Sequence, residues 1–423
     1  MLRLLYSTLM YLLSPCFMLY LLWRSRRAPS YRLRWAERFG FYKIDDCQSS
    51  IWVHAVSVGE AQAAVPLIKS LQESHPDTDI VITTTTPTGS AQVQETWGDS
   101  VIHVYAPYDL PDAVDRFLTK VKPSIAIFME TEIWPNILHA CSKRNIPTVL
   151  ANARMSHHSA SGYRKLCQFM RETMALIDAI AAQSQDDAAR LIGLGARIEA
   201  VQVTGSIKFD IQLAASIKEQ AAVLRRDWGV ERSVWIAAST RLGEDELILS
   251  AFAMVKQARP EALLVIVPRH PERFDSVASL CEKRGFNLVR RSAHQPCSKD
   301  TDIYLGDSMG ELSLFYAASD IAFIGGSLLP NGGQNPIEAA ALGLPILVGP
   351  HYYNFTDVMR LLCEEDAAVI VSDYEQLANT VIEYCEQPDI RHSRGEHAWE
   401  VVARNRGALE RLLKVIQDCE NKN

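Results

Sequence analysis

Short apolar runs alternate with longer amphipathic stretches along most of this chain. In the first half, runs rich in Ile, Val and Ala have the length of buried strands and lie at Ile51–Ala55, Ile80–Thr84, Val101–Tyr105, Ile125–Phe128, Thr148–Ala151, Ala179–Ala182 and Val201–Thr204. In the second half, similar runs lie at Val234–Ala238, Leu263–Val267, Phe286–Val289, Ile303–Leu305, Ile321–Ile324, Ile346–Val348 and Ala368–Val371. Helical patterns separate most of them, so the alternation predicts parallel sheets with helices on both faces.

The order of these elements predicts an α/β protein with two doubly wound, Rossmann-like units that face a cleft. We expect an apolar anchor at residues 1–28, a first unit at 29–205, a connector at 206–230, a second unit at 231–385 and a helical tail at 386–423. Ligands of such sheets bind beyond the carboxyl ends of the strands. The loops that follow the strands are therefore the candidate sites.

The N-terminal segment has no charged residue from Leu4 to Trp23, about the length that a helix needs to cross a bilayer. The arginines that follow are Arg24, Arg26, Arg27, Arg32, Arg34 and Arg38. Positive charge beside a span stays cytoplasmic, so we expect a single N-terminal anchor in the inner membrane and folded units in the cytosol. Two alternatives stay open: a helix that lies in the interface, because Pro15 interrupts the run, and a cleaved signal peptide, although no A-x-A site follows.

Charge and composition exclude several classes of protein. The formal net charge is -7, which provides no basic field for nucleic acid. The cysteines are scattered without a C-x-x-C pair, and no P-loop or G-x-G-x-x-G fingerprint occurs,. The D-x-D segments at Asp77–Asp79 and Asp300–Asp302 precede strands, which is the wrong side for a metal-bound sugar nucleotide. We expect no metal site.

The loop V-S-V-G-E after the first strand has the S-x-x-E spacing of a capping box at Ser57 and Glu60,. A helix is therefore expected to begin here and to run through Leu71. The helix dipole favours the ionised form of Glu60, and an ionised carboxylate at this place can act as a general base toward a hydroxyl. On the spacing alone, the capping role is the favoured explanation.

Three further loops of the first half carry charge. Glu130 and Glu132 end a strand, and alternation in an extended segment puts both on one face,. Arg154, in A-N-A-R-M-S, suits an anionic ligand, although a basic surface helix explains it too. Lys208, in T-G-S-I-K-F-D, lies at the junction of the halves, where a cleft needs a positive charge.

In the second half, Pro268 and Arg269 end a strand, and Ser308 with Glu311 again has capping-box spacing,. The last loop reads P-N-G-G-Q-N-P-I-E. Here Gly332 and Gly333 are expected to let the backbone approach a ligand closely. The N-cap of the helix that follows is expected at Asn335, with Pro336 as the first helical residue and Glu338 two residues further,. Capped helix starts at strand ends are typical of a nucleotide site.

Taken together, these loops resemble the Kdo (3-deoxy-D-manno-octulosonic acid) transferases of lipopolysaccharide synthesis, glycosyltransferase family 30. The matching motifs are R-x-R-W-A-E-R-F-G, H-A-V-S-V-G-E, M-E-T-E-x-W-P-N, N-A-R-x-S, T-G-S-x-K-F-D, P-R-H-P-E-R and G-G-Q-N-P-I-E, between Arg32 and Glu338. The resemblance implies a GT-B fold, CMP-Kdo as the donor substrate, a lipid IVA acceptor and inversion at the anomeric carbon. It implies no cofactor and no required nucleotide-bound metal.

The resemblance also assigns roles to residues. Glu60 is expected to be the general base, and Glu130 and Lys208 are expected to support the transition state. The expected contacts of CMP are Pro268, Arg269, Met309, Gly310, Glu311, Asn335, Pro336, Ile337 and Glu338. Many family members have His where this chain has Gln334, which weakens any side-chain role there.

Two other functional classes stay open at this point. One is another GT-B nucleotide-sugar enzyme, such as a UDP-sugar transferase or epimerase. The other is a non-catalytic, membrane-tethered protein that binds nucleotide sugars. Nucleotide preference separates them from a CMP-sugar enzyme, because CMP should protect the latter from unfolding and UDP should not.

Overall fold

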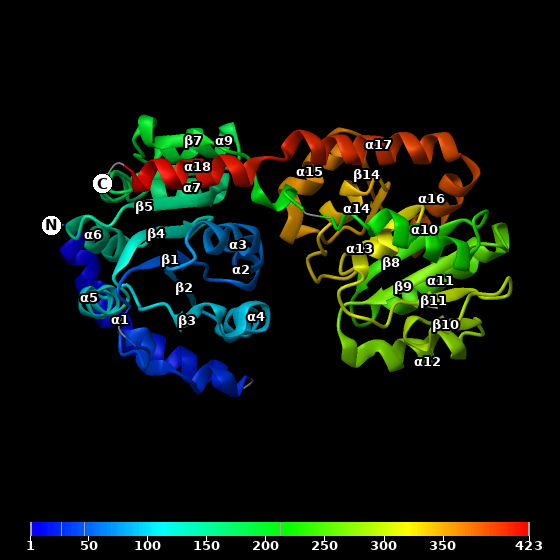
Figure 1. Ribbon diagram of the computed structural model, residues 1–423, viewed down its shortest axis with the longest axis horizontal. Coiled ribbons are helices and arrows are strands. Elements are labelled where there is room, and N and C mark those ends of the chain that lie inside the picture. Colours follow the sequence, from blue (N-terminus) through cyan, green and yellow to red (C-terminus); the bar gives the residue numbers. More distant parts are fainter. Residues whose placement is uncertain (1, 27, 46, 212, 422–423) are drawn as a thin grey trace. The chain divides into compact units, whose positions relative to one another are not determined.

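The computed structural model describes residues 2–26, 28–45, 47–211 and 213–421. The chain forms two compact units. Unit 1 comprises residues 1–210 and 406–423, and unit 2 comprises residues 211–405. The chain therefore leaves unit 1 after Asp210 and returns to it at Arg406 (Figure 1).

Unit 1 is built on a parallel sheet with the strand order β3-β2-β1-β4-β5-β6-β7. Its strands are β1 (Ser50–His54), β2 (Asp79–Thr84), β3 (Ile102–Tyr105), β4 (Pro123–Met129), β5 (Thr148–Ala153), β6 (Ala179–Ala182) and β7 (Val201–Val203). Each of the seven runs of the first half is a strand, and the prediction of a parallel sheet is confirmed.

Helices surround this sheet. The α-helices of unit 1 are α1 (Leu2–Ser25), α2 (Val58–Ala63), α3 (Val65–Ser74), α4 (Pro87–Trp97), α5 (Pro111–Val121), α6 (Pro135–Lys143), α7 (His157–Arg164), α8 (Cys167–Met174), α9 (Gln185–Gly193) and α18 (Ala408–Glu420). Its 3-10 turns are η1 (Pro29–Arg32), η2 (Trp35–Phe39), η3 (Gly98–Ser100), η4 (Ile198–Ala200) and η5 (Ile207–Phe209). The single helix expected from Ser57 through Leu71 is wrong. It divides into α2 and α3 at Pro66, because proline provides no backbone N–H inside a helix,.

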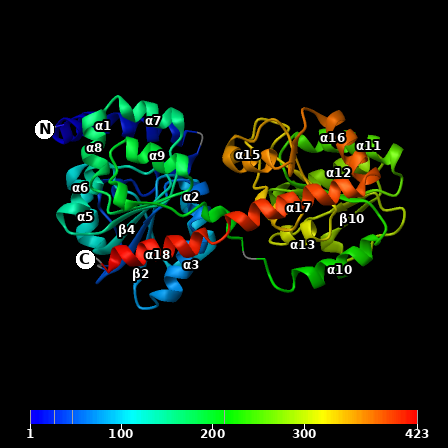
Figure 2. The same cartoon turned by 90° about the horizontal axis from the view of Figure 1, so that it is seen from above.

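Alternation along each strand gives unit 1 two cores. Trp52 and Phe128 face one side of the sheet, where they pack with α5, α6 and α8. Ile51 and Val53 face the other side, where they pack with α3, α4 and α18. Figure 1 shows α18, in red, along this sheet, and the view in Figure 2 shows it beside α3. The alternation is the period of two that an extended strand imposes on side chains.

Unit 2 repeats the architecture with the strand order β10-β11-β9-β8-β12-β13-β14, all parallel. Its strands are β8 (Val234–Thr240), β9 (Leu263–Pro268), β10 (Leu288–Arg290), β11 (Ile303–Leu305), β12 (Ile321–Ile324), β13 (Ile346–Val348) and β14 (Ala368–Ile370). Its α-helices are α10 (Ile217–Trp228), α11 (Glu244–Ala258), α12 (Phe274–Lys283), α13 (Leu312–Ala317), α14 (Ile337–Ala341), α15 (Thr356–Glu364), α16 (Tyr374–Glu386) and α17 (Pro388–Asn405). Its 3-10 turns are η6 (Pro271–Arg273), η7 (Arg291–Ala293) and η8 (Tyr353–Phe355). The seven runs of the second half are all strands.

One side chain fixes the return of the chain into unit 1. The carboxylate of Asp210 accepts hydrogen bonds from the backbone N–H groups of Gly407 (2.6 Å) and Leu409 (2.5 Å), at the start of α18. These N–H groups have no partner within the helix. Asp210, where the chain leaves unit 1, is therefore bonded to the start of α18, where the chain enters unit 1 again.

We predict that Asp210→Ala lowers the free energy of unfolding of unit 1 by about 1–3 kcal/mol, because two helix N–H groups lose a charged acceptor. Hydrogen exchange should become faster in α18 before it changes elsewhere. The matched control is Asp186→Ala, whose side chain is 84% exposed, with an expected change within about 0.5 kcal/mol. Equal losses in the two variants would contradict this role of Asp210.

Candidate functional site

Glu60 lies beyond the carboxyl end of β1, in the first turn of α2. The Ser57 hydroxyl accepts a hydrogen bond from the Glu60 N–H (3.2 Å), and the Glu60 carboxylate accepts from the Ser57 hydroxyl (2.9 Å) and the Val56 N–H (2.7 Å). The predicted cap is therefore confirmed. Burial, together with the nearby Glu132, raises the pKa of Glu60 from 4.5 to about 7, although both hydrogen bonds favour the ionised form. A carboxylate with this pKa can accept a proton near neutral pH.

Glu130 and Lys208 form an ion pair, with 2.7 Å between Nζ and Oε1. Glu130 follows β4, and Lys208 lies in η5, after β7. The turn that carries Lys208 is fixed by Asn152 of β5, whose side-chain oxygen accepts from the Ile207 N–H (3.2 Å). Arg154 lies at the edge of the pair, 4.0 Å from the Glu130 carboxylate. The structure thus brings three charged residues of separate motifs to the carboxyl edge of one sheet.

The expectation of an extended segment at Glu130 and Glu132 is wrong. Glu130 has a φ of +57°, so a left-handed turn, and not strand alternation, directs the two side chains. Both carboxylates nevertheless lie close enough to Glu60 to raise its pKa, Glu132 more than Glu130. The result is a group of three carboxylates with one lysine bound directly to one of them.

A buried histidine stands behind Glu132. His54 has no exposed surface, and burial lowers its pKa to about 3, so the ring is neutral. The Thr83 hydroxyl contacts both the Trp52 indole N–H and His54 Nδ1, each at 2.8 Å. Since an indole N–H only donates, Thr83 accepts there and its own proton is left for Nδ1. This favours the tautomer with a proton on Nε2, which lies 3.8 Å from the Glu132 carboxylate.

Trp134 completes the surroundings of Glu132. Its indole N–H donates to the Glu132 carboxylate (2.5 Å), and its ring packs edge-on against His54. Burial raises the pKa of Glu132, whereas the indole hydrogen bond lowers it. Neither His54 nor Trp134 was assigned a role from the sequence, although both lie in the motifs that carry the resemblance.

In unit 2, the loops after β9 and β12 meet. Burial raises the pKa of the Glu338 carboxyl, whereas a hydrogen bond from the Ser313 hydroxyl (3.0 Å) and the nearby Arg269 lower it. The Asn335 side-chain oxygen accepts from the Ile337 N–H (3.0 Å). The prediction of Asn335 as the N-cap is nevertheless wrong, because the N-cap is Pro336 and α14 begins at Ile337. A cation and a half-buried carboxylate therefore lie together at this sheet edge.

The capping box expected at Ser308 and Glu311 is wrong. Gly310 has a φ of +80°, and α13 begins only after Glu311. The Ser308 hydroxyl donates instead to the Glu311 carboxylate, which also accepts two hydrogen bonds from Arg291 (2.6 and 3.0 Å). Met309 stands 56% exposed beside this cluster.

The glycines of the last loop are explained by packing of the chain itself. Gly332 and Gly333 have φ values of +90° and +74°. A Cβ at Gly332 would lie 2.3 Å from the Asn354 side chain, and one at Gly333 would lie 3.2 Å from Tyr352. The requirement for glycine here therefore follows from backbone conformation and contacts within unit 2, and the approach of a ligand stays a prediction.

Two residues of unit 2 were missed by sequence analysis. Glu244 has no exposed surface, and its carboxylate accepts from the N–H groups of Gly326, Ser327 and Leu328 at 2.6–3.0 Å. It thereby fixes the loop after β12. Arg241, which directly follows β8, contacts His270 (2.6 Å), and burial together with the neighbouring Arg269 and Arg273 lowers its pKa. A basic residue at a strand end was the available signal for Arg241.

Comparison with known proteins identifies the family. Residues 33–211 match the model of 3-Deoxy-D-manno-octulosonic-acid transferase (kdotransferase), and residues 244–401 match glycosyl transferases group 1. A 3-deoxy-D-manno-octulosonic acid transferase of Haemophilus influenzae is 42% identical over 424 residues, which cover 100% of this chain and 99% of that protein. The chain belongs to the Kdo transferase family. It is a glycosyltransferase. A second relative, a 3-deoxy-D-manno-octulosonic acid transferase of Bordetella pertussis, is 37% identical, with 87% of each chain covered.

The fold of this Kdo transferase is GT-B. A UDP-GlcNAc 2-epimerase from Neisseria meningitidis, solved with UDP-GlcNAc, has a TM-score of 0.56 at 15% identity, over 88% of this chain and 100% of that one. The HepE protein of Anabaena, solved with UDP, has a TM-score of 0.53 at 13% identity and the same coverage of both chains. At these identities the likeness concerns the fold alone.

One motif of the Kdo transferase resemblance has a structural role. Arg38, in R-x-R-W-A-E-R-F-G, is 4% exposed, donates to the Thr85 carbonyl (2.8 Å) and stacks on Tyr105. Arg34 pairs with Glu37 (2.6 Å). The buried Arg38 is therefore not available to a lipid headgroup. Arg27 lies outside the described residues.

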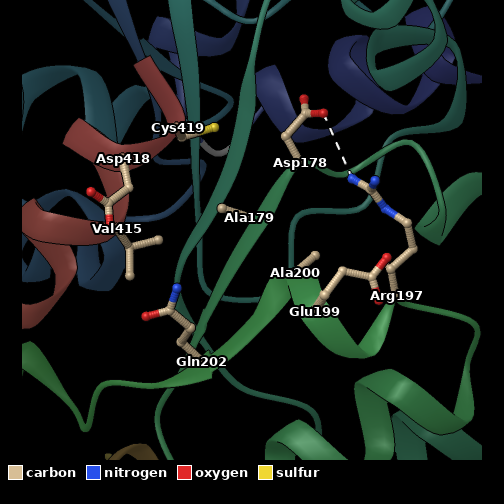
Figure 3. Close-up of a pocket in the computed structure, with 9 residues that line it drawn as sticks. All are labelled: Asp178, Ala179, Arg197, Glu199, Ala200, Gln202, Val415, Asp418 and Cys419. Atoms are coloured by element: carbon tan, nitrogen blue, oxygen red, sulfur yellow. Dashed lines mark ion pairs between the residues drawn. The ribbon is translucent and has the colours of Figure 1, made fainter. Parts of the chain in front are cut away.

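A pocket of about 180 Å³ lies at the other end of the unit 1 sheet, between α18 and the amino ends of β6 and β7 (Figure 3). Asp178, Glu199 and Asp418 line it, and Arg197 pairs with Asp178 at 3.8 Å. The candidate site is at the carboxyl ends of the strands, so this pocket is separate from it. Over the part of the chain that the structure describes, no cluster of three His, Cys, Asp or Glu side chains suits a metal ion, and the independence from metal stays a prediction.

We predict that Glu60→Gln stabilises the protein in a pH-dependent way. A carboxyl whose pKa is raised to about 7 in the folded state contributes stability at low pH that is lost as the pH rises from about 4.5 to 7. The variant does not titrate, so its advantage should be near zero at pH 4 and reach about 3 kcal/mol at pH 8. Thermal unfolding across this range measures it, with the exposed Glu73→Gln as control. A pH-independent difference would contradict the assignment.

Proposed function

We propose that the protein transfers Kdo from CMP-Kdo to lipid IVA, with inversion at the anomeric carbon, on the cytoplasmic side of the inner membrane. The observation that carries the proposal is Glu60. It is a partly buried carboxylate at a strand end, and its pKa of about 7 suits a base at neutral pH. Membership of the Kdo transferase family supplies the transferred sugar.

In the proposed reaction, the acceptor hydroxyl gives its proton to the Glu60 carboxylate. The hydroxyl oxygen bonds to the anomeric carbon as the bond from that carbon to the phosphate oxygen breaks, and CMP leaves as an anion. Attack from the face opposite the phosphate inverts the configuration. Glu130 and Lys208, fixed by their 2.7 Å ion pair, provide charges of both signs where charge develops in the transition state.

We assign the donor to unit 2. Arg269 offers a cation to the CMP phosphate, and the Glu338 carboxylate offers acceptors to ribose hydroxyls, with one position already taken by Ser313. The assigned contacts further include the backbone of Met309–Glu311 and Asn335–Ile337. Gln334, where many family members have His, has a protein partner: its side-chain oxygen accepts from Arg241 at 3.3 Å in the amide orientation that satisfies both groups.

We predict that wild-type protein converts lipid IVA and CMP-Kdo to a Kdo-lipid product, and that Glu60→Gln lowers kcat by about 10²–10⁴-fold, the usual worth of a general base. The assay is mass spectrometry of the lipid, which also counts the Kdo units. CMP should raise the Tm of both proteins and UDP should not, which shows that the variant is folded and binds donor. No product from wild type that binds CMP would refute the acceptor. Full activity of the variant would reduce Glu60 to a helix cap.

We also predict that Glu132→Gln moves the acidic limb of the kcat/KM profile to lower pH. The ionised form of Glu60 is the active base, and the charge of Glu132 raises the pKa of Glu60. Removing that charge leaves Glu60 ionised at lower pH. Glu132→Asp keeps the charge and should retain the wild-type limb. An unchanged limb in Glu132→Gln, or an equal displacement in both variants, would show that Glu132 does not act through Glu60.

A further inference from the structure

One face of α1 contacts unit 1 along the whole helix. The buried and half-buried positions recur every three or four residues, at Leu2, Arg3, Tyr6, Ser7, Met10, Ser14, Phe17, Leu21 and Ser25. This spacing is the period of an α-helix, so these side chains share one face. One face of the helix is therefore buried against unit 1 and the other is exposed, although almost all residues of the helix are uncharged.

The first two turns are held by polar contacts. The hydroxyl of Ser7 and the guanidinium of Arg3 donate to the side-chain oxygen of Asn136 (2.9 and 3.3 Å). The Tyr6 hydroxyl donates to Asp109 (2.8 Å), a carboxylate with no exposed surface that also accepts from two N–H groups at the start of α6. The Tyr6 ring packs on Phe169, with centroids 5.4 Å apart.

The contacts continue further along the helix. The Tyr11 hydroxyl donates to Asp112 of α5 (2.5 Å), and Asp112 also accepts from Arg116. The Phe17 ring packs on Tyr108 with centroids 5.4 Å apart. Figure 1 shows α1, in dark blue, running past α5. Residues 3 to 17 therefore lie alongside charged surface helices of the same unit.

The opposite face of α1 is apolar and open. Its large exposed apolar side chains include Leu4, Leu5, Leu9, Leu12, Leu13, Met18, Leu19, Leu22 and Trp23, and Leu12 is 71% exposed. A contiguous apolar surface of this length is rare on soluble monomers and marks a contact with a membrane or another protein. Arg24, Arg26 and Arg32 lie exposed at its end. Basic side chains beside an apolar face favour an anionic lipid surface.

A spanning orientation is incompatible with these contacts. The hydrocarbon core of a bilayer is about 30 Å thick, which is the length of residues 4–23 as a helix. If α1 crossed it while unit 1 stayed attached, Asp112 and Arg116 would lie at hydrocarbon depth, where charged side chains and irregular backbone are strongly disfavoured. If unit 1 detached, the buried Asp109 would lose the Tyr6 hydroxyl, and Asn136 would lose Ser7 and Arg3.

We propose that α1 lies flat in the membrane interface, with its exposed leucines in the acyl boundary, its arginines at anionic headgroups and its other face on unit 1. This orientation rests on the proposed function only for the identity of the membrane. It also has a consequence for the site, because Asn136 ends the motif that carries Glu130 and Glu132. The helix then holds the catalytic edge of unit 1 close to the lipid surface from which a lipid acceptor comes.

The first test is proximity and sidedness in native membranes. The background changes to serine the cysteines that are not buried, Cys16, Cys167, Cys297 and Cys363. In it, the pair Tyr11→Cys with Asp112→Cys should be cross-linked within one chain by a short bismaleimide, whereas the pair Tyr20→Cys with Asp112→Cys should not. A single Leu2→Cys should resist a membrane-impermeant maleimide in intact spheroplasts and react in inverted vesicles. No cross-link for the first pair, or labelling of Leu2→Cys from outside, would overturn the flat orientation.

The second test uses purified full-length protein and vesicles of phosphatidylcholine with phosphatidylglycerol. Leu12→Glu should weaken vesicle binding by at least about tenfold, the effect of losing one buried leucine side chain, and Leu12→Phe should bind like wild type. Both variants should keep the CMP-dependent rise in Tm. Equal binding of Leu12→Glu, or a stable dimer that covers the apolar face without lipid, would overturn the proposal. Vesicle binding without Kdo transfer would refute the proposed function and leave this orientation intact.

Discussion

The ion pair between Glu130 and Lys208 joins the loops of the candidate site at the carboxyl edge of the unit 1 sheet. It joins residues 78 positions apart, one after a central strand and one after an edge strand, at 2.7 Å. The left-handed backbone of Glu130 orients its side chain, and the hydrogen bond from the Ile207 N–H to Asn152 holds the turn that carries Lys208. Lys208 and, at 4.0 Å, Arg154 offset part of the charge of Glu130, whereas Glu60 and Glu132 have no ion pair with a lysine or arginine among the described residues. Burial and the charge of Glu132 raise the pKa of Glu60 to about 7. Burial and the charge of Glu130 raise the pKa of Glu132.

The strands and the capped start of α2 could be predicted because local physics decides them. A buried parallel strand needs a continuous apolar run, and the bonds between Ser57 and Glu60 span only three residues. Two predictions were wrong for the opposite reason. Glu130 itself has a positive φ, and so does Gly310, which lies between Ser308 and Glu311. Nothing in the alternation of side chains announces such a turn.

The missed residues share another property. Asp109 and Glu244 are buried carboxylates that accept hydrogen bonds from backbone N–H groups distant in sequence, 27 positions away for Asn136 and 82 for Gly326. Every residue except proline has a backbone N–H. The amino-acid sequence therefore does not indicate which N–H group will bond to a buried carboxylate. Buried carboxylates are tolerated only when their oxygens are satisfied, and here they define where a loop or a helix begins. Such sites become visible only when the fold is known.

The return of the chain into unit 1 constrains the order in which the protein can be made. The apolar face formed by Ile51, Val53 and their neighbours is covered in part by α18, and α18 follows all of unit 2 in sequence. A ribosome therefore releases unit 2 complete before it releases the last cover of unit 1. During that interval one side of the unit 1 sheet still lacks a helix. The first unit to leave the ribosome is thus the last to close.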